Sequence, residues 1–275
     1  MVRIRATHRG FTLIELVMVM VILGIIAMTL APVINQNVTA FTDTRSRTEL
    51  TAKGRLALQR LARELRHTVP YSIELLSPTR IQFVTTPAGG RYITKTGSTP
   101  KISNATCAKD GERFFAGANL TALCVLFPTA LTLPTNGALV IGNTSPANLN
   151  AMNNPGSWIT LNAAAQPDAA THPALWKLTF TGGHTFAVDS SYKHYSIADF
   201  SHEVVLVGNQ ILWRRVNGIA DPTAGGGAVL VDGVTGLTFG DAASLASGLL
   251  SISITITDGT ESVTVQEEIY VRNSP

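Results

Sequence analysis

Two successive hydrophobic patterns occupy the first quarter of the chain. The run Leu16–Ala31 is apolar apart from one threonine, so no face of it is polar. From Leu50 onward, small and apolar residues recur at intervals of three and four, as on one face of a helix. We therefore predict one long helix over residues 11–68, with a uniformly apolar part at 11–31 and an amphipathic part at 32–68. The predicted stripe of the second part consists of Leu50, Gly54, Ala57, Leu58, Leu61, Ala62 and Leu65.

The apolar part is long enough to be a membrane span. Residues 11–31 in a helix cover about 31 Å at about 1.5 Å per residue, which matches a bilayer core of about 30 Å. Arg3, Arg5 and Arg9 precede it without any acidic residue, so the positive-inside rule predicts a cytoplasmic N-terminus. Pro32 follows the run directly, and we expect it to bend the helix without ending it.

Beyond residue 70 the hydrophobic period changes to two, which is typical of β-strands. The clearest hairpin has alternating apolar residues in 250–256, a turn at Asp258-Gly259 and a return strand in 263–271. Residues 96–156 are rich in Asn, Thr, Pro and Gly, and we expect long surface loops with short strands there. The other predicted strands are 72–76, 80–85, 91–94, 123–127, 138–141, 175–180, 185–188, 203–207 and 210–216. The predicted fold class is α+β, with the long helix packed on an antiparallel β-sheet head domain at 69–275.

Charge and cysteine content limit the possible functions. The net charge of +3 is matched by the three arginines among the first ten residues, so the rest is neutral and gives no support for nucleic-acid binding. Basic residues beside the helical stripe, such as Arg55 and Arg60, lack interleaved aromatics and are expected to form a solvated flank. Cys107 and Cys124 are the only cysteines. An even count in an exported head predicts one disulfide, with two free buried thiols as the alternative.

The junction before the apolar run reads Arg9-Gly10-Phe11-Thr12-Leu13-Ile14-Glu15. A lone carboxylate beside a membrane span is costly, so such a residue usually marks function. The junction resembles the class III signal of type IV prepilins and type II secretion pseudopilins. The resemblance implies that residues 1–10 are a leader, that a prepilin peptidase cleaves after Gly10 and methylates Phe11, and that Glu15 acts in assembly. The alternatives are an ordinary single-pass anchor and, for Glu15, a boundary residue reaching the membrane interface.

Two further stretches resemble minor pilins of the mannose-sensitive haemagglutinin (MSHA) pilus, of the MshO type. They are Leu50–Ile73, followed by Gly89–Tyr92, and the C-terminal Val263–Pro275. The wider resemblance includes PilW-type minor pilins and PulJ-type pseudopilins. It implies an inner-membrane subunit with a periplasmic head, moved into a pilus on the cell surface by a platform protein and an ATPase, in contact with major and minor pilins. A pseudopilin of a secretion system and a tip adhesin remain as alternatives.

An enzyme is the competing class of function. His172, His184, His194 and His202 lie in the predicted head, but none belongs to a nucleophile motif or has metal-ligand spacing. The aspartates of the head, which include Asp199, Asp221, Asp232, Asp241 and Asp258, do not follow calcium-loop spacing. We therefore predict no catalysis, no cofactor and no metal.

Overall fold

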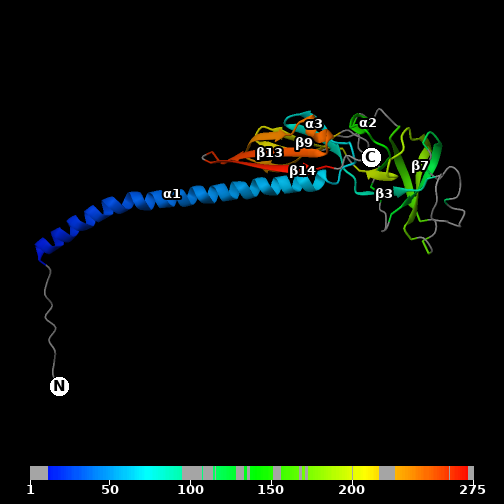
Figure 1. The fold of residues 1–275 in the computed structure, drawn as a ribbon. Coiled ribbons are helices and arrows are strands. Elements are labelled where there is room, and N and C mark those ends of the chain that lie inside the picture. The colour runs from blue at the N-terminus through cyan, green and yellow to red at the C-terminus, as the bar shows by residue number, and fades with distance from the viewer. Residues whose placement is uncertain are drawn as a thin grey trace, which may run out of the picture. The chain divides into compact units, whose positions relative to one another are not determined.

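A computed structural model shows two compact units, residues 1–49 and 50–275. One helix, α1, begins in the first unit and ends in the second (Figure 1). The second unit holds all the strands. The structure describes residues 12–94, 107, 114, 116–127, 133–134, 137–150, 156–166, 169–170, 173–199, 201–216, 227–259 and 261–271.

Helix α1 covers Leu13–Leu65 and continues through Pro32, as predicted. It ends three residues before the predicted position 68. The reason is that Thr68 pairs with Thr85 as an isolated bridge, which draws the backbone toward the sheet. The residues of α1 that are buried are the seven of the predicted stripe, so the stripe is confirmed. The flanking Arg55 and Arg60 are exposed, as expected for a solvated flank.

Two antiparallel sheets form the core with the second part of α1. The first has the order β1-β2-β9-β10-β11 and the second the order β12-β13-β14 (Figure 1). Their isoleucines, valines and leucines form one core cluster with the buried stripe of α1. The bounds are β1 Glu74–Ser77, β2 Arg80–Val84, β9 Ser201–Val207, β10 Gln210–Val216, β11 Ala228–Asp232, β12 Val234–Phe239, β13 Leu249–Thr257 and β14 Ser262–Tyr270.

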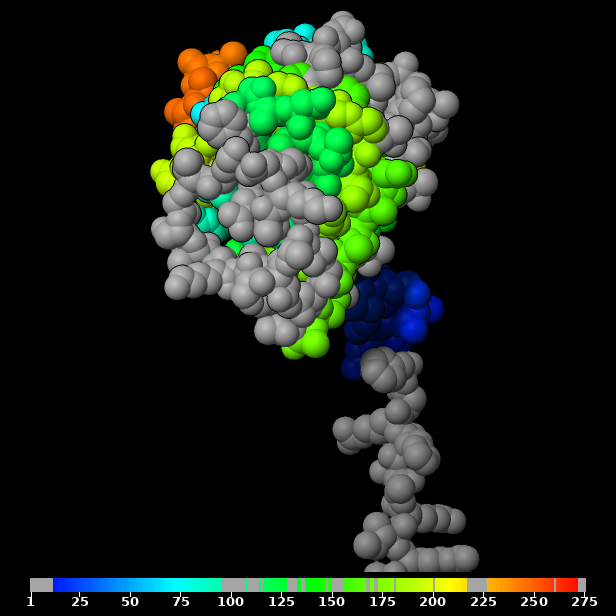
Figure 2. Space-filling view, turned by 90° about the vertical axis from the view of Figure 1, so that its right-hand side faces the viewer, coloured from blue at the N-terminus to red at the C-terminus, as the bar shows by residue number. Residues whose placement is uncertain are grey.

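The remaining strands close into a six-stranded antiparallel barrel. Its order is β3-β4-β7-β6-β5-β8, and its aromatic and aliphatic interior is a separate core cluster. Parts of the barrel, in green, are visible in Figure 2. The strand bounds are β3 Ala88–Tyr92, β4 Asn119–Leu126, β5 Ala138–Val140, β6 Trp158–Ala165, β7 Leu175–Thr185 and β8 His194–Ala198. Two short helices, α2 (Ala147–Asn150) and α3 (Ala242–Ala246), complete the described elements.

The barrel is an insertion between two paired strands. Strands β2 and β9 are hydrogen-bonded neighbours, with Val84 opposite Ser201, yet the whole barrel lies between them in the sequence. The chain leaves and returns at adjacent points, because the amide of Asp199 donates to the carbonyl of Thr85 at 3.0 Å. The head therefore consists of a helix-and-sheet part that is continuous in space and a barrel added at one sheet end.

Several strand predictions are confirmed and others need correction. The hairpins β9–β10 and β13–β14 form as predicted, with Gly208 and Gly259 at positive φ in their turns. The strand predicted at 175–180 is longer, since β7 runs to Thr185 and pairs with β4 up to that residue, whereas residues 186–188 of the predicted strand 185–188 are not in a strand. Within 96–156 the predicted strands 123–127 and 138–141 form as β4 and β5 of the barrel wall, and β4 begins earlier than predicted, at Asn119. Strands β6, β8, β11 and β12 are additional to those predicted.

A buried carboxylate joins the central strands of the five-stranded sheet. Glu203 on β9 is fully buried, and both of its oxygens accept hydrogen bonds, one from Nε of Arg80 and one from Nε of Arg214. A buried charge is tolerated only when it is paired and hydrogen-bonded. The two arginines lie on the strands on either side of Glu203, so this group ties β2, β9 and β10 together.

Candidate functional site

The predicted processing residues Gly10 and Phe11 lie outside the described residues. The described part of the chain begins at Thr12, and α1 begins one residue later. Glu15 lies in the first turn of α1. The geometry of the site is therefore that of Thr12, Glu15 and the apolar helix surface that follows them.

Thr12 and Glu15 form a capping box at the start of α1. Oε2 of Glu15 accepts from the backbone N–H of Thr12 at 3.1 Å and from its hydroxyl at 3.0 Å. The backbone N–H of Glu15 lies 3.4 Å from Oγ1 of Thr12. Such a reciprocal pair satisfies backbone donors that a helix start leaves free, and a negative charge in the first turn also suits the helix dipole. The carboxylate is thus held at the amino end of the helix.

Thr12 is a site residue that the hydrophobic pattern and the prepilin resemblance do not single out. The hydrophobic pattern and the prepilin resemblance both mark Glu15 as a lone charge, but neither assigns a role to Thr12. A signal for Thr12 does exist in the sequence, because Thr12-Leu13-Ile14-Glu15 has the Ser/Thr-x-x-Glu spacing of a capping box. The structure places the two side chains in direct contact.

The surface of α1 after Glu15 is apolar and exposed. Large aliphatic side chains from Leu13 to Val38 are exposed, and no charged residue occurs between Glu15 and Asp43. The hydroxyl of Thr29 donates to the carbonyl of Ile26 at 2.9 Å, so even this polar group is satisfied within the helix. A continuous exposed apolar surface of this kind marks contact with a membrane or with other proteins. Among the described residues, α1 is the one helix long and apolar enough to cross a membrane.

Cys107 and Cys124 form a disulfide in the barrel. Their Cα atoms are 6.1 Å apart, and Cys124 lies on β4. Both cysteines are buried beside Leu175, with Ile93 packed against them. The bond closes a loop of 17 residues, a length for which chain entropy predicts about 3 kcal/mol of stabilisation.

His184, His194 and His202, the candidate histidines that the structure describes, do not come together with acids in a metal-binding group. In the described part of the chain, no three His, Cys, Asp or Glu side chains are placed to hold a metal ion. His184 packs edge-on against Phe186, and its burial lowers the pKa of the imidazole. His194 is on β8 beside Tyr192, and His202 is on β9. His172 lies outside the described residues.

The aspartates considered as calcium ligands also have separate structural roles. Asp232 pairs with Lys53 of α1, which lowers the pKa of the carboxyl. Asp241 caps α3 by accepting from the N–H of Ser244 at 2.7 Å. Asp258 accepts from the N–H of Glu261 at 2.9 Å in the last hairpin. Asp221 lies outside the described residues, and Asp199 lines a cleft described below.

Comparison with known proteins identifies the N-terminal segment. Residues 5–31 match the prokaryotic N-terminal methylation motif. None of the curated proteins or solved structures compared with the chain is significantly similar to it. The motif implies processing by a prepilin peptidase and assembly with other pilins, and the apolar helix fits a single-pass inner-membrane anchor. The N-terminal methylation motif, the long helix and the antiparallel head together support a type IV pilin-like or pseudopilin-like protein.

Proposed function

We propose that the chain is a minor pilin of the MshO type, which takes part in the biogenesis of an MSHA-type pilus by priming or capping assembly. The observation that carries the proposal is the methylation motif at residues 5–31, joined to an exposed and uncharged helix surface. The head supports a minor rather than a major role, because it adds a whole barrel to the helix-and-sheet part. A structural subunit, rather than an enzyme, follows from the same motif.

In this proposal the peptidase cleaves after Gly10 and methylates the new amino group of Phe11. The capping box then holds the Glu15 carboxylate at the amino end of α1, within reach of a neighbouring subunit's N-terminus. In a filament the methylated ammonium of that neighbour neutralises the carboxylate inside an apolar bundle. A buried unpaired charge is costly, so the pair forms only in the correct register and thereby selects it.

The assembly partners follow from the same scheme. Before assembly the helix anchors the subunit in the inner membrane, with the head in the periplasm. A platform protein and an ATPase move it into the filament, where α1 packs against the helices of other pilins. A PulJ-type pseudopilin would share every one of these steps, and the two are distinguished by the genes beside this one, a pilus cluster or a secretion operon.

The processing step is tested by the mass of the protein isolated from membranes. We expect a polypeptide that begins at a methylated Phe11, and a Gly10→Leu variant that retains the leader. A wild-type protein that begins at an unmodified Met1 would overturn the proposal.

The assembly step is tested with Glu15→Ala. We expect normal cleavage but loss of most of the subunit from sheared filaments, because the neighbouring ammonium loses its partner. Asp43→Asn is the matched control, since it removes a carboxylate from the same helix outside the apolar run. Equal incorporation of both variants would refute the role of Glu15.

A further inference from the structure

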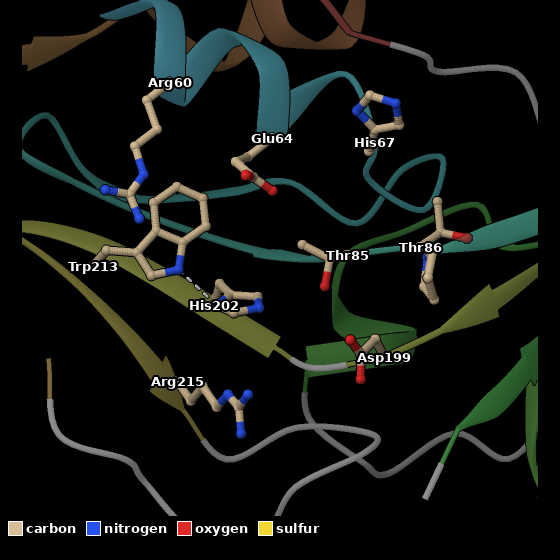
Figure 3. Close-up of a pocket in the computed structure, with 10 residues that line it drawn as sticks. Arg60, Glu64, His67, Thr85, Thr86, Asp199, His202, Trp213 and Arg215 are labelled. Carbon is tan, nitrogen blue, oxygen red and sulfur yellow. Dashed lines mark hydrogen bonds between the residues drawn. The ribbon is translucent and has the colours of Figure 1, made fainter. Parts of the chain in front are cut away.

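A cleft opens where the carboxyl end of α1 meets the five-stranded sheet (Figure 3). We call it the root cleft, because both chain connections to the barrel run along it. Its volume is about 410 Å³, within the range of about 300–1,000 Å³ found for small-molecule sites. It is lined by Arg60, Glu64, His67, Thr85, Thr86, Pro87, Asp199, His202, Trp213 and Arg215.

The cleft exists because the face of the five-stranded sheet that packs on α1 extends beyond the last buried residues of the core. Phe83 on β2 is fully buried in the core, and His202 is its direct neighbour on β9. Arg215 on β10 is paired with His202 in the next strand. Helix α1 ends at Leu65, so the polar end of this face is covered only by side chains from its last turns.

One wall of the cleft is aromatic and held in place. The indole Nε1 of Trp213 donates to Nδ1 of His202 at 2.8 Å (Figure 3). Trp213 also meets Phe83 edge-to-face, with ring centroids 5.3 Å apart. Burial, with a smaller effect of Arg215, lowers the pKa of His202 to about 4, so His202 is neutral at pH 7 and can accept this bond. The indole is therefore already oriented before any ligand arrives.

The opposite side carries a carboxylate oxygen that needs a donor. Oδ1 of Asp199 is buried and receives no hydrogen bond from the residues that the structure describes. Burial raises the pKa of this carboxyl, and the charge of Arg215 opposes the rise. A buried polar atom without a partner is rare in folded proteins and calls for an explanation. Because Asp199 lines the cleft, a small rotation of its carboxylate would let a ligand hydroxyl supply the missing hydrogen bond.

The charges around the cleft select a neutral ligand. Arg60 and Arg215 bring two positive charges, while Glu64 and Asp199 bring two negative ones when ionised. An anion would meet the carboxylates and a cation would meet the guanidinium groups. A neutral molecule with several hydroxyl groups can instead donate to the carboxylates and accept from the guanidinium groups.

We propose that the root cleft binds a neutral hexose ring of a glycan. The less polar face of the ring packs against the indole of Trp213. One hydroxyl donates to Oδ1 of Asp199, and other hydroxyl oxygens accept from Arg60 and Arg215. This binding function goes beyond filament assembly and does not depend on it, because every residue involved belongs to the second unit.

The test is binding of simple hexosides to the full-length protein in a detergent without a sugar headgroup. Methyl β-galactopyranoside and methyl β-glucopyranoside are titrated by saturation-transfer NMR and by tryptophan fluorescence. We expect saturable binding of at least one hexoside with a dissociation constant of about 1 mM. Sodium phosphate and glycerol, which lack the neutral ring, should not compete.

Variants link the binding to the cleft. Asp199→Asn should weaken hexoside binding about tenfold, because the amide replaces one charged acceptor oxygen. Glu268→Gln makes the same chemical change on the exposed outer face of β14 and should bind like the wild type. Arg60→Gln, at an exposed helix position, should also weaken hexoside binding about tenfold. This variant replaces Asp199→Asn in the test if Asp199→Asn fails to fold.

Three results would overturn the proposal. The first is no saturable binding of either hexoside up to about 100 mM, a hundred times the expected constant. The second is binding that is unchanged in folded Asp199→Asn and Arg60→Gln. The third is competition by phosphate, which would make the cleft an anion site. Cleavage and piliation are unaffected by these outcomes, so the assembly role is tested separately.

Discussion

The two parts of α1 have the same secondary structure but opposite surfaces. From Leu13 to Glu49 the large apolar side chains are exposed on all sides of the helix, whereas from Leu50 to Leu65 they are buried along one stripe. The second part follows the pattern of a helix packed on a sheet, and its stripe shares one core cluster with both sheets of the head's helix-and-sheet part. The first part has the all-round apolar pattern of a helix surrounded by lipid or by other helices.

One continuous helix thus serves two separate purposes. The stripe stabilises the fold of the head, and the uniform surface stabilises contacts outside the chain. Substitutions in the stripe should therefore change the stability of the head, while substitutions in the uniform surface should change membrane anchoring and assembly.

The largest expected effect comes from a matched leucine pair. Leu61 is 0% exposed in the stripe and Leu23 is 58% exposed in the uniform part. Leu61→Ala should lower the free energy of unfolding of the head by about 2–5 kcal/mol, because it leaves a cavity. Leu23→Ala should change it by less than about 0.5 kcal/mol. All three tryptophans lie beyond residue 150, so denaturant unfolding followed by their fluorescence reports on the head. Equal losses of unfolding free energy in the two variants would contradict the separate roles of the two parts of α1.

A close approach of α1 to the sheet gives the second prediction. A Cβ atom at Gly54 would lie 2.5 Å from Cγ2 of Val265 on β14 and 3.3 Å from Cδ1 of Ile256. Gly54→Val should therefore destabilise the head by about 1–3 kcal/mol through overpacking. Adding Val265→Ala removes the methyl group in the way, so a double-mutant cycle should show favourable coupling. Simple additivity of the two changes would mean that this contact does not limit the packing.

Mild acid should affect the head through His202, whereas the first part of α1 contains no histidine. The pKa of His202 is lowered from 6.5 to about 4 by burial and by Arg215. Between these values the unfolded chain binds a proton that the folded head does not, so stability falls as the pH drops from about 6.5 to 4. The loss should be on the order of 1 kcal/mol, after allowance for the partial exposure of the ring.

His202→Asn isolates this contribution, because the amide keeps an acceptor for Trp213 but does not titrate. His184 shifts in the same direction and the raised pKa of Asp199 acts in the opposite one, so the difference between wild type and variant is the informative quantity. Parallel curves of unfolding free energy against pH for the two proteins, from pH 7 to pH 4, would show that His202 does not cause the loss of stability in acid.

The smallest effect is expected for the exposed ion pairs of the two parts. Lys53 and Asp232 pair between α1 and β11, and Arg45 and Glu49 pair within the helix. Exposed pairs add little stability and are screened by salt. Asp232→Asn should lower the melting temperature slightly at low salt and not at high salt, and Glu49→Gln should leave it unchanged at both. A large loss from Asp232→Asn at high salt would show that this contact is more than a surface pair.

The sequence alone is sufficient to predict the helix, its buried stripe and the hairpins β9–β10 and β13–β14. These features depend on local periodicity and on turn residues such as Gly208 and Gly259. Both are properties of short stretches of sequence and do not depend on how distant parts of the chain pack. The methylation motif is equally local, so Gly10, Phe11 and Glu15 can be proposed as site residues from the sequence by itself. The capping partner Thr12 is also predictable from its spacing to Glu15.

Only the tertiary structure decided how the head is divided. The barrel closes through pairings between strands far apart in sequence, such as β3 with β8, and two of its strands, β6 and β8, are not predicted by the local pattern. The same folding ends α1 at Leu65 and brings Arg60, Asp199 and Trp213 to one cleft. Periodicity determines which side of an element is apolar, whereas long-range packing determines what that side contacts, and this chain shows both within a single helix.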